Sequence, residues 1–486
     1  MFIKNFAVLC VMGSVVSAIQ FSAFAAPNQS AAATSSNDAA AKKAEVEHQK
    51  MRSSLFGAME DLLQNNKELL AMQRELKAVH ESRVGVIAAF RPTVALVARY
   101  RGAENKEWKY DVAPRVDRTS EKSYGLEVKQ NLYRGRSDLA AKKEIDLAIR
   151  ARWHQYERKK QELLRDLAIL YAALIAKKEE ITHLKALLAN RKESVEVAKE
   201  MYETGAVKPL DLEQANAACL ETEAKLAKAE AEFVAHCTKF EEMTGKPIPV
   251  NLVVPDKMFD ELITDDQAVL IALEENPEVI SANYAVLSAK EAIKKPNPEF
   301  TPTVDLILGM EKSRDSGHKH EIQNQTQRTG YSRRGVTMTL NATVPIYDGG
   351  TGRAEKRRAV ENSEKAAVDK AHAIEKIRTE VSAVLAALKA AKQNLVFAVK
   401  AVEMRVLALH DTQEEYKAGI KIMNDVLEAQ WHLFEAKHIA VQAAEQYFVS
   451  QCRALALIGR MTPKYLKITD YDFDYIRHYE KTKNRF

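Results

Sequence analysis

The sequence predicts a mostly α-helical protein with a minor β part, in which one structural unit occurs twice. Three observations support this: segments repeat at a constant offset, each copy contains a very long run without Gly or Pro, and each contains two runs of alternating polarity. The composition of 17 Gly and 13 Pro in 486 residues is typical of long helices. The net charge of +5 is spread along the chain, so we expect no nucleic-acid partner, which would require clustered Lys and Arg.

Residues 1–25 have the features of a secretory signal peptide. Lys4 precedes an apolar stretch, and Ala23-Phe24-Ala25 suits cleavage before Ala26. A membrane anchor is the alternative interpretation of this segment. Residues 26–44 are of low complexity and are predicted to be a disordered linker. No later stretch of 18 apolar residues is found, so we expect an exported chain without a spanning helix.

The duplication defines the predicted domains. The pairs matched at an offset of 214 residues are 130–135 with 344–349, 202–205 with 416–419, and Gly245 with Gly459. Further upstream, Asn66 matches Asn276 at an offset of 210. Several pairs in one register indicate a tandem duplication. The predicted order is a first repeat at 45–250, a linker at 251–264, a second repeat at 265–463 and a C-terminal tail at 464–486.

Each repeat is expected to begin with a helical segment, over 45–89 and 265–295, and to continue with a pair of strands. In the second repeat, apolar residues from Val336 to Val344 alternate with polar ones, which predicts a strand with one apolar face. The connections 101–123 and 311–334 are polar and are predicted to be long loops. This pattern fits a membrane β-barrel, while a soluble hairpin with one buried face remains an alternative.

A helical hairpin follows each strand pair. Residues 136–204 and 353–418 contain neither Gly nor Pro, so each predicts a helix on the order of 100 Å long. Their heptad-like apolar spacing indicates helix-to-helix packing. Turns at Gly205 and Gly419 then lead into second helices, predicted over the ranges 210–243 and 424–458.

Four strands per chain cannot close a barrel, and an open sheet edge is forbidden in lipid because its backbone groups would stay unpaired. Three copies would supply twelve strands. If the strands lie in a membrane, a trimer therefore follows, with the helical hairpins forming an α-barrel below a 12-stranded transmembrane β-barrel.

Several motifs resemble the TolC-like outer membrane efflux family from about residue 45 to 463. They are Asn276-Pro277-Glu278, Val344-Pro345-Ile346-Tyr347-Asp348-Gly349-Gly350, and Tyr416 with Gly419, Asp425 and Gln430. The resemblance implies a homotrimeric exit duct of a tripartite efflux or type I secretion system, in the outer membrane and extending into the periplasm. It also implies a periplasmic adaptor and an inner-membrane transporter as partners.

The resemblance further implies a passive conduit that performs no chemistry and needs no cofactor. In agreement, the sequence contains no Gly-rich phosphate loop, nucleophile motif or metal-ligand cluster. Residues carried over from the family place a periplasmic aperture at Asp425 and Glu428 and a gating latch at Asp211, Tyr416 and Lys421. Three copies of the two aperture acids would attract cations, whereas one exposed Lys421–Asp211 pair contributes only about 0–1 kcal/mol.

Simpler roles remain open for these residues. Asp211 and Asp425 follow the hairpin turns closely, where an Asp commonly caps a helix N-terminus, and Tyr416 could merely pack in the turn. The main alternative for the whole chain is a periplasmic helical-hairpin adaptor or scaffold protein of an export complex. An exported enzyme is disfavoured because no catalytic set of residues converges.

Overall fold

The computed structural model describes residues 55–110, 112–204, 208–249, 252, 265–295, 301–320, 326–468 and 475–482. The predicted signal peptide and disordered linker, the turn at Gly205 and most of the 251–264 linker lie outside these residues. The chain divides into two compact units. The helical unit comprises Met1–Arg74, His154–Ile280 and His372–Phe473, and the sheet unit comprises Glu75–Trp153, Ser281–Ala371 and Asp474–Phe486.

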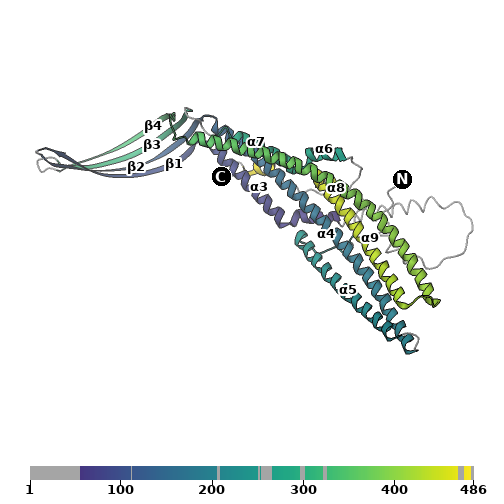
Figure 1. Cartoon of the computed structure of the whole chain (residues 1–486). Coiled ribbons are helices and arrows are strands. Elements are labelled where there is room, and N and C mark those ends of the chain that lie inside the picture. The colour runs from purple at the N-terminus through teal and green to yellow at the C-terminus, as the bar shows by residue number, and fades with distance from the viewer. Residues whose placement is uncertain are drawn as a thin grey trace, which may run out of the picture. The chain divides into compact units, whose positions relative to one another are not determined.

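The sheet unit contains four antiparallel strands in the order β1-β2-β3-β4 (Figure 1). Their bounds are β1 Thr93–Lys109, β2 Val112–Arg134, β3 Thr303–His320 and β4 Thr326–Thr343. Each repeat contributes one hairpin, and β2 pairs with β3 across the two repeats. Since β1 and β4 each have a neighbour on one side only, both outer edges of the sheet carry unpaired backbone groups.

The prediction of long polar loops between paired strands was wrong. Arg101 pairs with Glu121 and Glu311 pairs with Gly335, so β1 to β4 continue through most of the segments expected to be loops. The ladder hydrogen bonds come from the backbone and do not require apolar side chains. Alternating hydrophobicity marks only the part of a strand with one apolar face, and both faces are polar in these extensions.

Most of the large apolar residues of the four strands lie on one face of the sheet, while Val97 and Ile307 lie on the other. Directly opposed residues share a face, and two consecutive rows cross the sheet in register. The rows are Val94–Val128–Leu308–Met338 and Leu96–Leu126–Met310–Val336. Their side chains are largely uncovered in the single chain, with Leu96 80% and Met338 73% exposed.

The helices follow the predicted order. They are α3 Lys67–Ala88, α4 Ser137–Glu203, α5 Pro209–Thr244, α6 Asp265–Glu275, α7 Pro277–Ala292, α8 Thr351–Lys417, α9 Met423–Ile458, α10 Pro463–Leu466 and α11 Tyr475–Thr482. The long helices α4 and α8 have 67 residues each, and α5 and α9 have 36 each. The predicted duplicated helical hairpins with a minor four-stranded part are thus confirmed.

Apolar side chains hold the helical unit together in separate clusters along the helices. One cluster joins Ala272 of α6 to Val381 of α8 and Ile458 of α9. Another joins Leu184 of α4 to Phe434 of α9. Such burial stabilises by about 25 cal/mol per Å² of apolar surface.

Among the described residues, one helix is long and apolar enough to span a membrane, although the sequence was expected to contain no such segment after residue 25. By length and composition alone, α8 contains an 18-residue window with a mean hydropathy of 1.2, of which 28% is buried. Helices that pack in a bundle can have the same length and composition.

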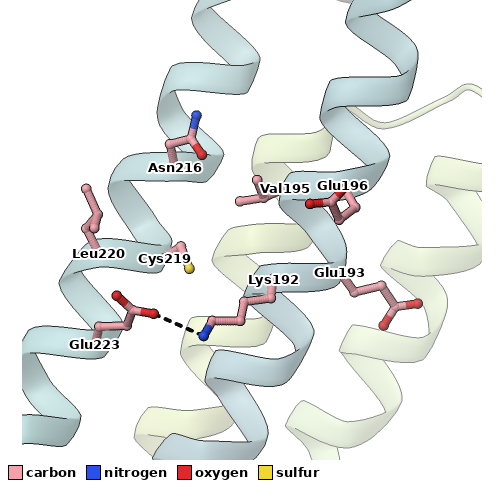
Figure 2. Close-up of a pocket in the computed structure, with 8 residues that line it drawn as sticks. All are labelled: Lys192, Glu193, Val195, Glu196, Asn216, Cys219, Leu220 and Glu223. Atoms are coloured by element: carbon pink, nitrogen blue, oxygen red, sulfur yellow. Dashed lines mark ion pairs between the residues drawn. The ribbon is translucent and has the colours of Figure 1, made fainter.

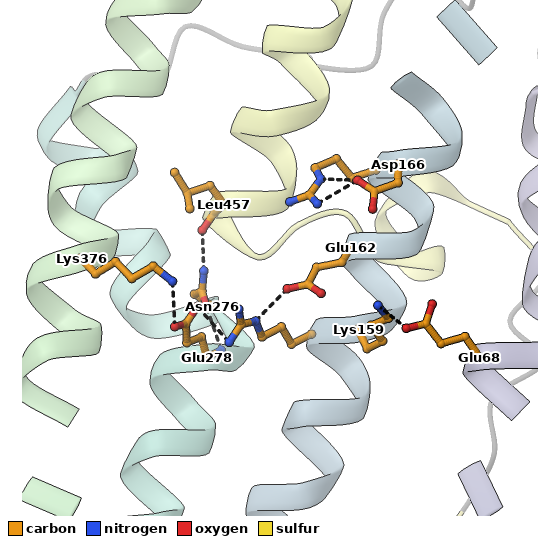
Figure 3. A network of polar contacts seen from close by, with 10 residues as sticks. Glu68, Lys159, Glu162, Asp166, Asn276, Glu278, Lys376 and Leu457 are labelled. Atoms are coloured by element: carbon orange, nitrogen blue, oxygen red, sulfur yellow. Dashed lines mark hydrogen bonds and ion pairs between the residues drawn. The ribbon is translucent and has the colours of Figure 1, made fainter. Parts of the chain in front are cut away.

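Two equivalent asparagines explain why the repeats share the Asn-x-Glu motif. Asn66 donates its Nδ2 to the Met243 carbonyl at 3.1 Å. Asn276 likewise donates its Nδ2 to the Leu457 carbonyl at 2.8 Å, as drawn in Figure 3. Met243 and Leu457 are themselves 214 residues apart. Asn276 Oδ1 also accepts the Glu278 backbone N–H at 2.8 Å, as an N-terminal cap does. Each of the two opening helical segments is therefore interrupted at its asparagine.

Glu278 connects three helices beside this cap. Its carboxylate lies 3.3 Å from Arg158 of α4 and 3.2 Å from Lys376 of α8. Figure 3 labels Glu278 and Lys376 and marks the contact between them. Arg158 also bonds Glu162 at 2.9 Å. Because the Glu278 carboxylate has two cationic partners on two helices, it fixes the start of α7 against both of them.

Candidate functional site

The described hairpin turn of the second repeat lies between α8 and α9. Gly419 has a φ of +78°, and nothing lies within 4 Å of the position that a Cβ would take there; this backbone conformation favours Gly. Its N–H donates to the Tyr416 carbonyl at 3.0 Å, and the Ile420 N–H donates to the Glu415 carbonyl at 2.9 Å. These bonds close the C-terminus of α8. The equivalent Gly205 lies outside the described residues.

Asp211 and Asp425 have equivalent places at the starts of α5 and α9. The N-cap residues are Lys208 and Ile422, so neither Asp is itself the N-cap. Each Asp lies three residues after its N-cap residue, and its carboxylate accepts a hydrogen bond from the backbone N–H of that residue. The distance from nitrogen to oxygen is 3.1 Å in both cases. A carboxylate there also interacts favourably with the helix dipole. Both Asp residues thus help to cap a helix N-terminus, but from the third position of the helix and not from the N-cap itself.

Tyr416 connects the two hairpins. Its hydroxyl donates to Met201 Sδ of α4 at 3.3 Å. Its ring packs on a cluster that contains Ala198 of α4, Ala215 of α5 and Met423 of α9. Burial, and then the nearby Asp211 carboxylate, raise the pKa of Tyr416. The structure therefore brings Tyr416 close to Asp211.

Lys421 does not join this arrangement in the single chain. Its side chain is exposed, and the described contacts include no ion pair between Lys421 and Asp211. Of the three predicted latch residues, Tyr416 and Asp211 are neighbours, whereas Lys421 has no bond to either of them among the described residues.

The two predicted aperture acids lie on the first turns of α9. Asp425 is half-buried, and Glu428 is exposed. Glu428 Oε1 lies 3.5 Å from His432 Nε2, and His432 Nδ1 lies 3.6 Å from Glu435. These contacts are all within α9, so the carboxylates are held by their own helix. Among the described residues no group of three or more His, Cys, Asp or Glu could hold a metal ion.

Two cationic residues that the sequence did not single out hold the start of α9. Arg191 of α4 is only 5% exposed and donates Nη2 to the Leu427 carbonyl at 2.8 Å. Burial lowers its pKa. Lys225 of α5 lies 3.7 Å from the centroid of the Trp431 ring, a cation–π contact. No sequence signal marks either residue, because both resemble the solvated cations common in charged helices.

An open hollow lies between α4 and α5 near the same end of the helices (Figure 2). Its volume is about 560 Å³. Lys192 and Glu223 bridge it at 3.1 Å, and Val195 and Leu220 supply apolar surface. Leu220 is 66% exposed, so the hollow combines apolar surface with charged margins.

We predict that the half-buried His183 makes the stability of the helical unit depend on pH. Burial, followed by Lys437 and His438 of α9, lowers the pKa of His183 to about 4. The unfolded chain, with an ordinary imidazole near 6.5, binds a proton first as the pH falls. Stability from neutral His183 is therefore complete above about pH 6.5 and is lost towards pH 4. We expect a loss of about 2 kcal/mol after allowing for partial exposure.

Thermal unfolding followed by circular dichroism between pH 7.5 and 4 checks this expectation. His183→Leu should flatten the decrease in melting temperature between pH 6.5 and 4 relative to wild type. The exposed His410→Leu is the control and should follow the wild-type profile. Identical slopes for wild type and His183→Leu would show that His183 does not carry the effect.

The chain matches a known protein family over both of its repeats. The model of the family described as "Outer membrane efflux protein" matches residues 58–246 and 269–460. The outer membrane efflux protein BepC of Brucella suis is 22% identical over 436 residues, which cover 89% of this chain and 91% of BepC. The outer membrane protein TolC of Vibrio cholerae is 22% identical over 82% of this chain and 89% of its own.

A solved structure has the same fold. The Campylobacter jejuni CmeC outer membrane channel superposes with a TM-score of 0.71 at 16% identity, over 86% of this chain and 90% of CmeC. The family match accounts for both repeats and confirms the predicted outer-membrane location, extending into the periplasm. The chain belongs to the outer membrane efflux protein family, whose members are channels and not enzymes.

Proposed function

We propose that three copies of this chain form a passive exit duct, gated at its periplasmic helical tip, in a tripartite efflux or type I secretion system. The observation that carries this proposal is the apolar face of the sheet. Two in-register apolar rows cross all four strands, and residues such as Leu96 and Met338 remain largely exposed. Exposed apolar surface of this extent requires a cover, and lipid is the cover that suits a strand with an opposite polar face.

The open edges of the sheet support assembly. In lipid, the free edges of β1 and β4 must be paired, and each can pair with the opposite edge of a neighbouring copy. Three copies of a four-stranded sheet give a closed barrel of twelve strands. On the face opposite the apolar rows, Arg99 lies 3.8 Å from Glu127 and Lys129 lies 3.9 Å from Asp305. Such paired charges suit a water-filled lumen.

Purification of the full chain from outer membranes tests the assembly and the duct together. We expect a trimer by native mass spectrometry in detergent and defined conductance steps in planar bilayers. A periplasmic adaptor, the rival function, would instead wash off the membrane at alkaline pH and give no conductance. That combination would contradict the proposal.

We also propose that the tip is the gate and that Tyr416 is part of its latch. Tyr416 lies between the hairpins, against Met201 of α4 and near Asp211 of α5. The second hairpin cannot move away from the first without breaking these contacts. Lys421 and Asp211 would complete the latch between neighbouring chains or in another state of the tip.

Releasing the latch should enlarge the pore. We expect Tyr416→Phe with Lys421→Ser to increase single-channel conductance by about twofold or more, because one hydrogen bond and one charge are lost in each of three copies. Lys417→Ser is the matched control, since Lys417 pairs with Glu414 on its own helix, at 2.8 Å. Equal conductance of the latch variant and wild type would remove these residues from the gate.

The proposed partners are an adaptor protein in the periplasm and an inner-membrane transporter. The hollow beside Leu220 is a candidate contact for the adaptor, because apolar surface with charged margins resembles the centre and rim of protein interfaces. A photo-crosslinker placed at Leu220 should capture the adaptor in cells. A crosslinker at Leu407 of α8 is the comparison position, and stronger capture there would relocate the contact.

A further inference from the structure

Immediately beyond the apolar rows, the same face of the sheet becomes aromatic and basic. The next row contains Tyr124, Lys312 and Arg334, and the row after it contains Tyr100, Lys122 and Arg314. We name Lys122, Lys312, Arg314 and Arg334 the basic quartet. These four residues belong to three adjacent strands and two adjacent rows, so their backbone positions fall within about 12 Å of one another.

Charge is distributed unevenly between the two faces of the strand extensions. Over residues 100–108, 116–124, 311–317 and 330–335, the face that continues the apolar rows carries six cations and one acid. They are Lys106, Arg118, Lys122, Lys312, Arg314 and Arg334, with Glu104. The opposite face carries two cations and five acids. They are Arg101 and Arg333, with Glu107, Asp117, Glu121, Glu311 and Asp315.

The basic quartet has no carboxylate partner among the described residues. The one acid on its face, Glu104, is already bound to Arg118 at 3.0 Å and to Lys106 at 3.5 Å. Lys122 instead lies 5.8 Å from the centre of the Tyr100 ring, and Lys312 lies 5.8 Å from that of Tyr124.

The cations of the opposite face near the apolar rows are different. Arg99 and Lys129 each have a carboxylate partner within 4.0 Å. Like charges gathered on one face without counter-charges attract an anion from outside the chain. The uncompensated charge of the quartet therefore favours an anionic partner on this face of the sheet.

We infer that the basic quartet binds the phosphate groups of outer-leaflet glycolipid headgroups. The inference rests on the proposed function, because it requires the apolar rows to face lipid. Tyrosines at the end of an apolar band mark the depth of the membrane interface, and cations just beyond them meet lipid phosphates. Arg314 and Arg334 can each hold two phosphate oxygens, and the lysines add point charges. A trimer would present three such quartets around the barrel.

Lipid binding by the purified full chain tests the inference. The test variant is Lys122→Gln, Lys312→Gln, Arg314→Gln and Arg334→Gln combined, and the control is Arg101→Gln with Arg333→Gln on the opposite face. Native mass spectrometry in detergent would measure binding of diphosphorylated lipid A, of dephosphorylated lipid A and of inorganic phosphate. We expect the test variant to bind diphosphorylated lipid A at least tenfold more weakly, and the control to bind within twofold of wild type.

Other outcomes would overturn the inference. Equal binding by the test variant, or equal binding of dephosphorylated lipid A to wild type, would exclude phosphate recognition by the quartet. Binding of inorganic phosphate at the same concentration as the lipid would show a free-anion site instead. If the test variant fails to fold, Lys312→Gln with Arg314→Gln should still reduce binding severalfold, whereas Arg314→Lys with Arg334→Lys should retain it.

Conductance separates this inference from the proposed function. A test variant that loses lipid but conducts like wild type would support the quartet and leave the duct intact. A wild-type chain that binds lipid A but forms no pore would contradict the duct. A conducting wild type whose lipid binding is insensitive to the quartet would contradict the inference alone.

Discussion

Replacing Asp425 by Asn together with Glu428 by Gln should lower the cation-over-anion selectivity of the reconstituted pore by about fivefold or more. Three copies of two carboxylates would ring the aperture, and focused negative charge enriches cations at a narrow opening. Asn retains an oxygen that can accept the Ile422 N–H, which Asp425 binds at 3.1 Å, so the start of α9 should stay capped. Reversal potentials in a salt gradient across a planar bilayer measure the effect.

Glu223→Gln is the matched control for the aperture variant. Glu223 lies on α5 and pairs with Lys192 of α4 at 3.1 Å, on the hollow between these helices. This variant removes a carboxylate from the helical unit without changing α9, and its selectivity should equal that of wild type. If the aperture variant also keeps wild-type selectivity, Asp425 and Glu428 do not ring the opening, and the fold assignment is unaffected.

Among the described glycines with positive φ, Gly459 is the one whose replacement by Ala should lower the stability of the protein most. Gly459 closes α9 at a φ of +88°, and a Cβ there would lie 2.5 Å from the Glu275 carbonyl oxygen and 2.9 Å from the Asn276 nitrogen. Both atoms are backbone, at the break between α6 and α7, and cannot move aside alone. We expect a cost of about 4 kcal/mol or more, measured as a lost or strongly lowered thermal transition in detergent.

Gly349→Ala separates backbone strain from steric overlap. Gly349 has a φ of +72°, but nothing lies within 4 Å of the position a Cβ would take. The substitution should therefore cost only about 1 kcal/mol, the penalty of the left-handed conformation itself. If Gly459→Ala melts within a few degrees of Gly349→Ala, the packing of α9 against the α6–α7 break is looser than the structure describes.

The long helices could be predicted from the sequence because helix formation is a local property. The absence of Gly and Pro over 136–204 and 353–418, with apolar spacing near 3.5 residues, leaves little choice of structure. The observed helices α4 and α8 end within two residues of these ranges. The duplication could also be detected from the sequence, because equivalent turns in the two repeats require the same residue types, such as Gly245 and Gly459.

The strand extensions could not be predicted in this way. Residues 101–123 and 311–334 are polar on both faces, so they carry no periodic signal, although backbone pairing continues through most of them. The sidedness of their charge emerges only from the register, which places Lys312 beside Tyr124 and Arg334 beside Lys312. The β2–β3 part of this register joins residues more than a hundred positions apart in the sequence, such as Tyr124 and Lys312.

In the candidate site, too, the residues defined by local features could be predicted and those defined by distant contacts could not. Asp211 and Asp425 were identified from their place after the turns, a local feature. Arg191 was not, because its partner is the backbone carbonyl of Leu427, 236 residues further along the chain. Every residue has a backbone carbonyl, so the type of residue at position 427 does not indicate that its carbonyl accepts a hydrogen bond from Arg191.

The amino-acid sequence by itself determined the duplicated hairpins, the amphipathic strands and the turn positions, because these follow from periodicity and from the conformational preferences of Gly, Pro and Asp. The tertiary structure alone decided the length of the sheet, the alignment of its apolar and basic rows and the contacts that hold α9. These depend on which distant residues meet, and the free energy of a contact belongs to the pair rather than to either residue.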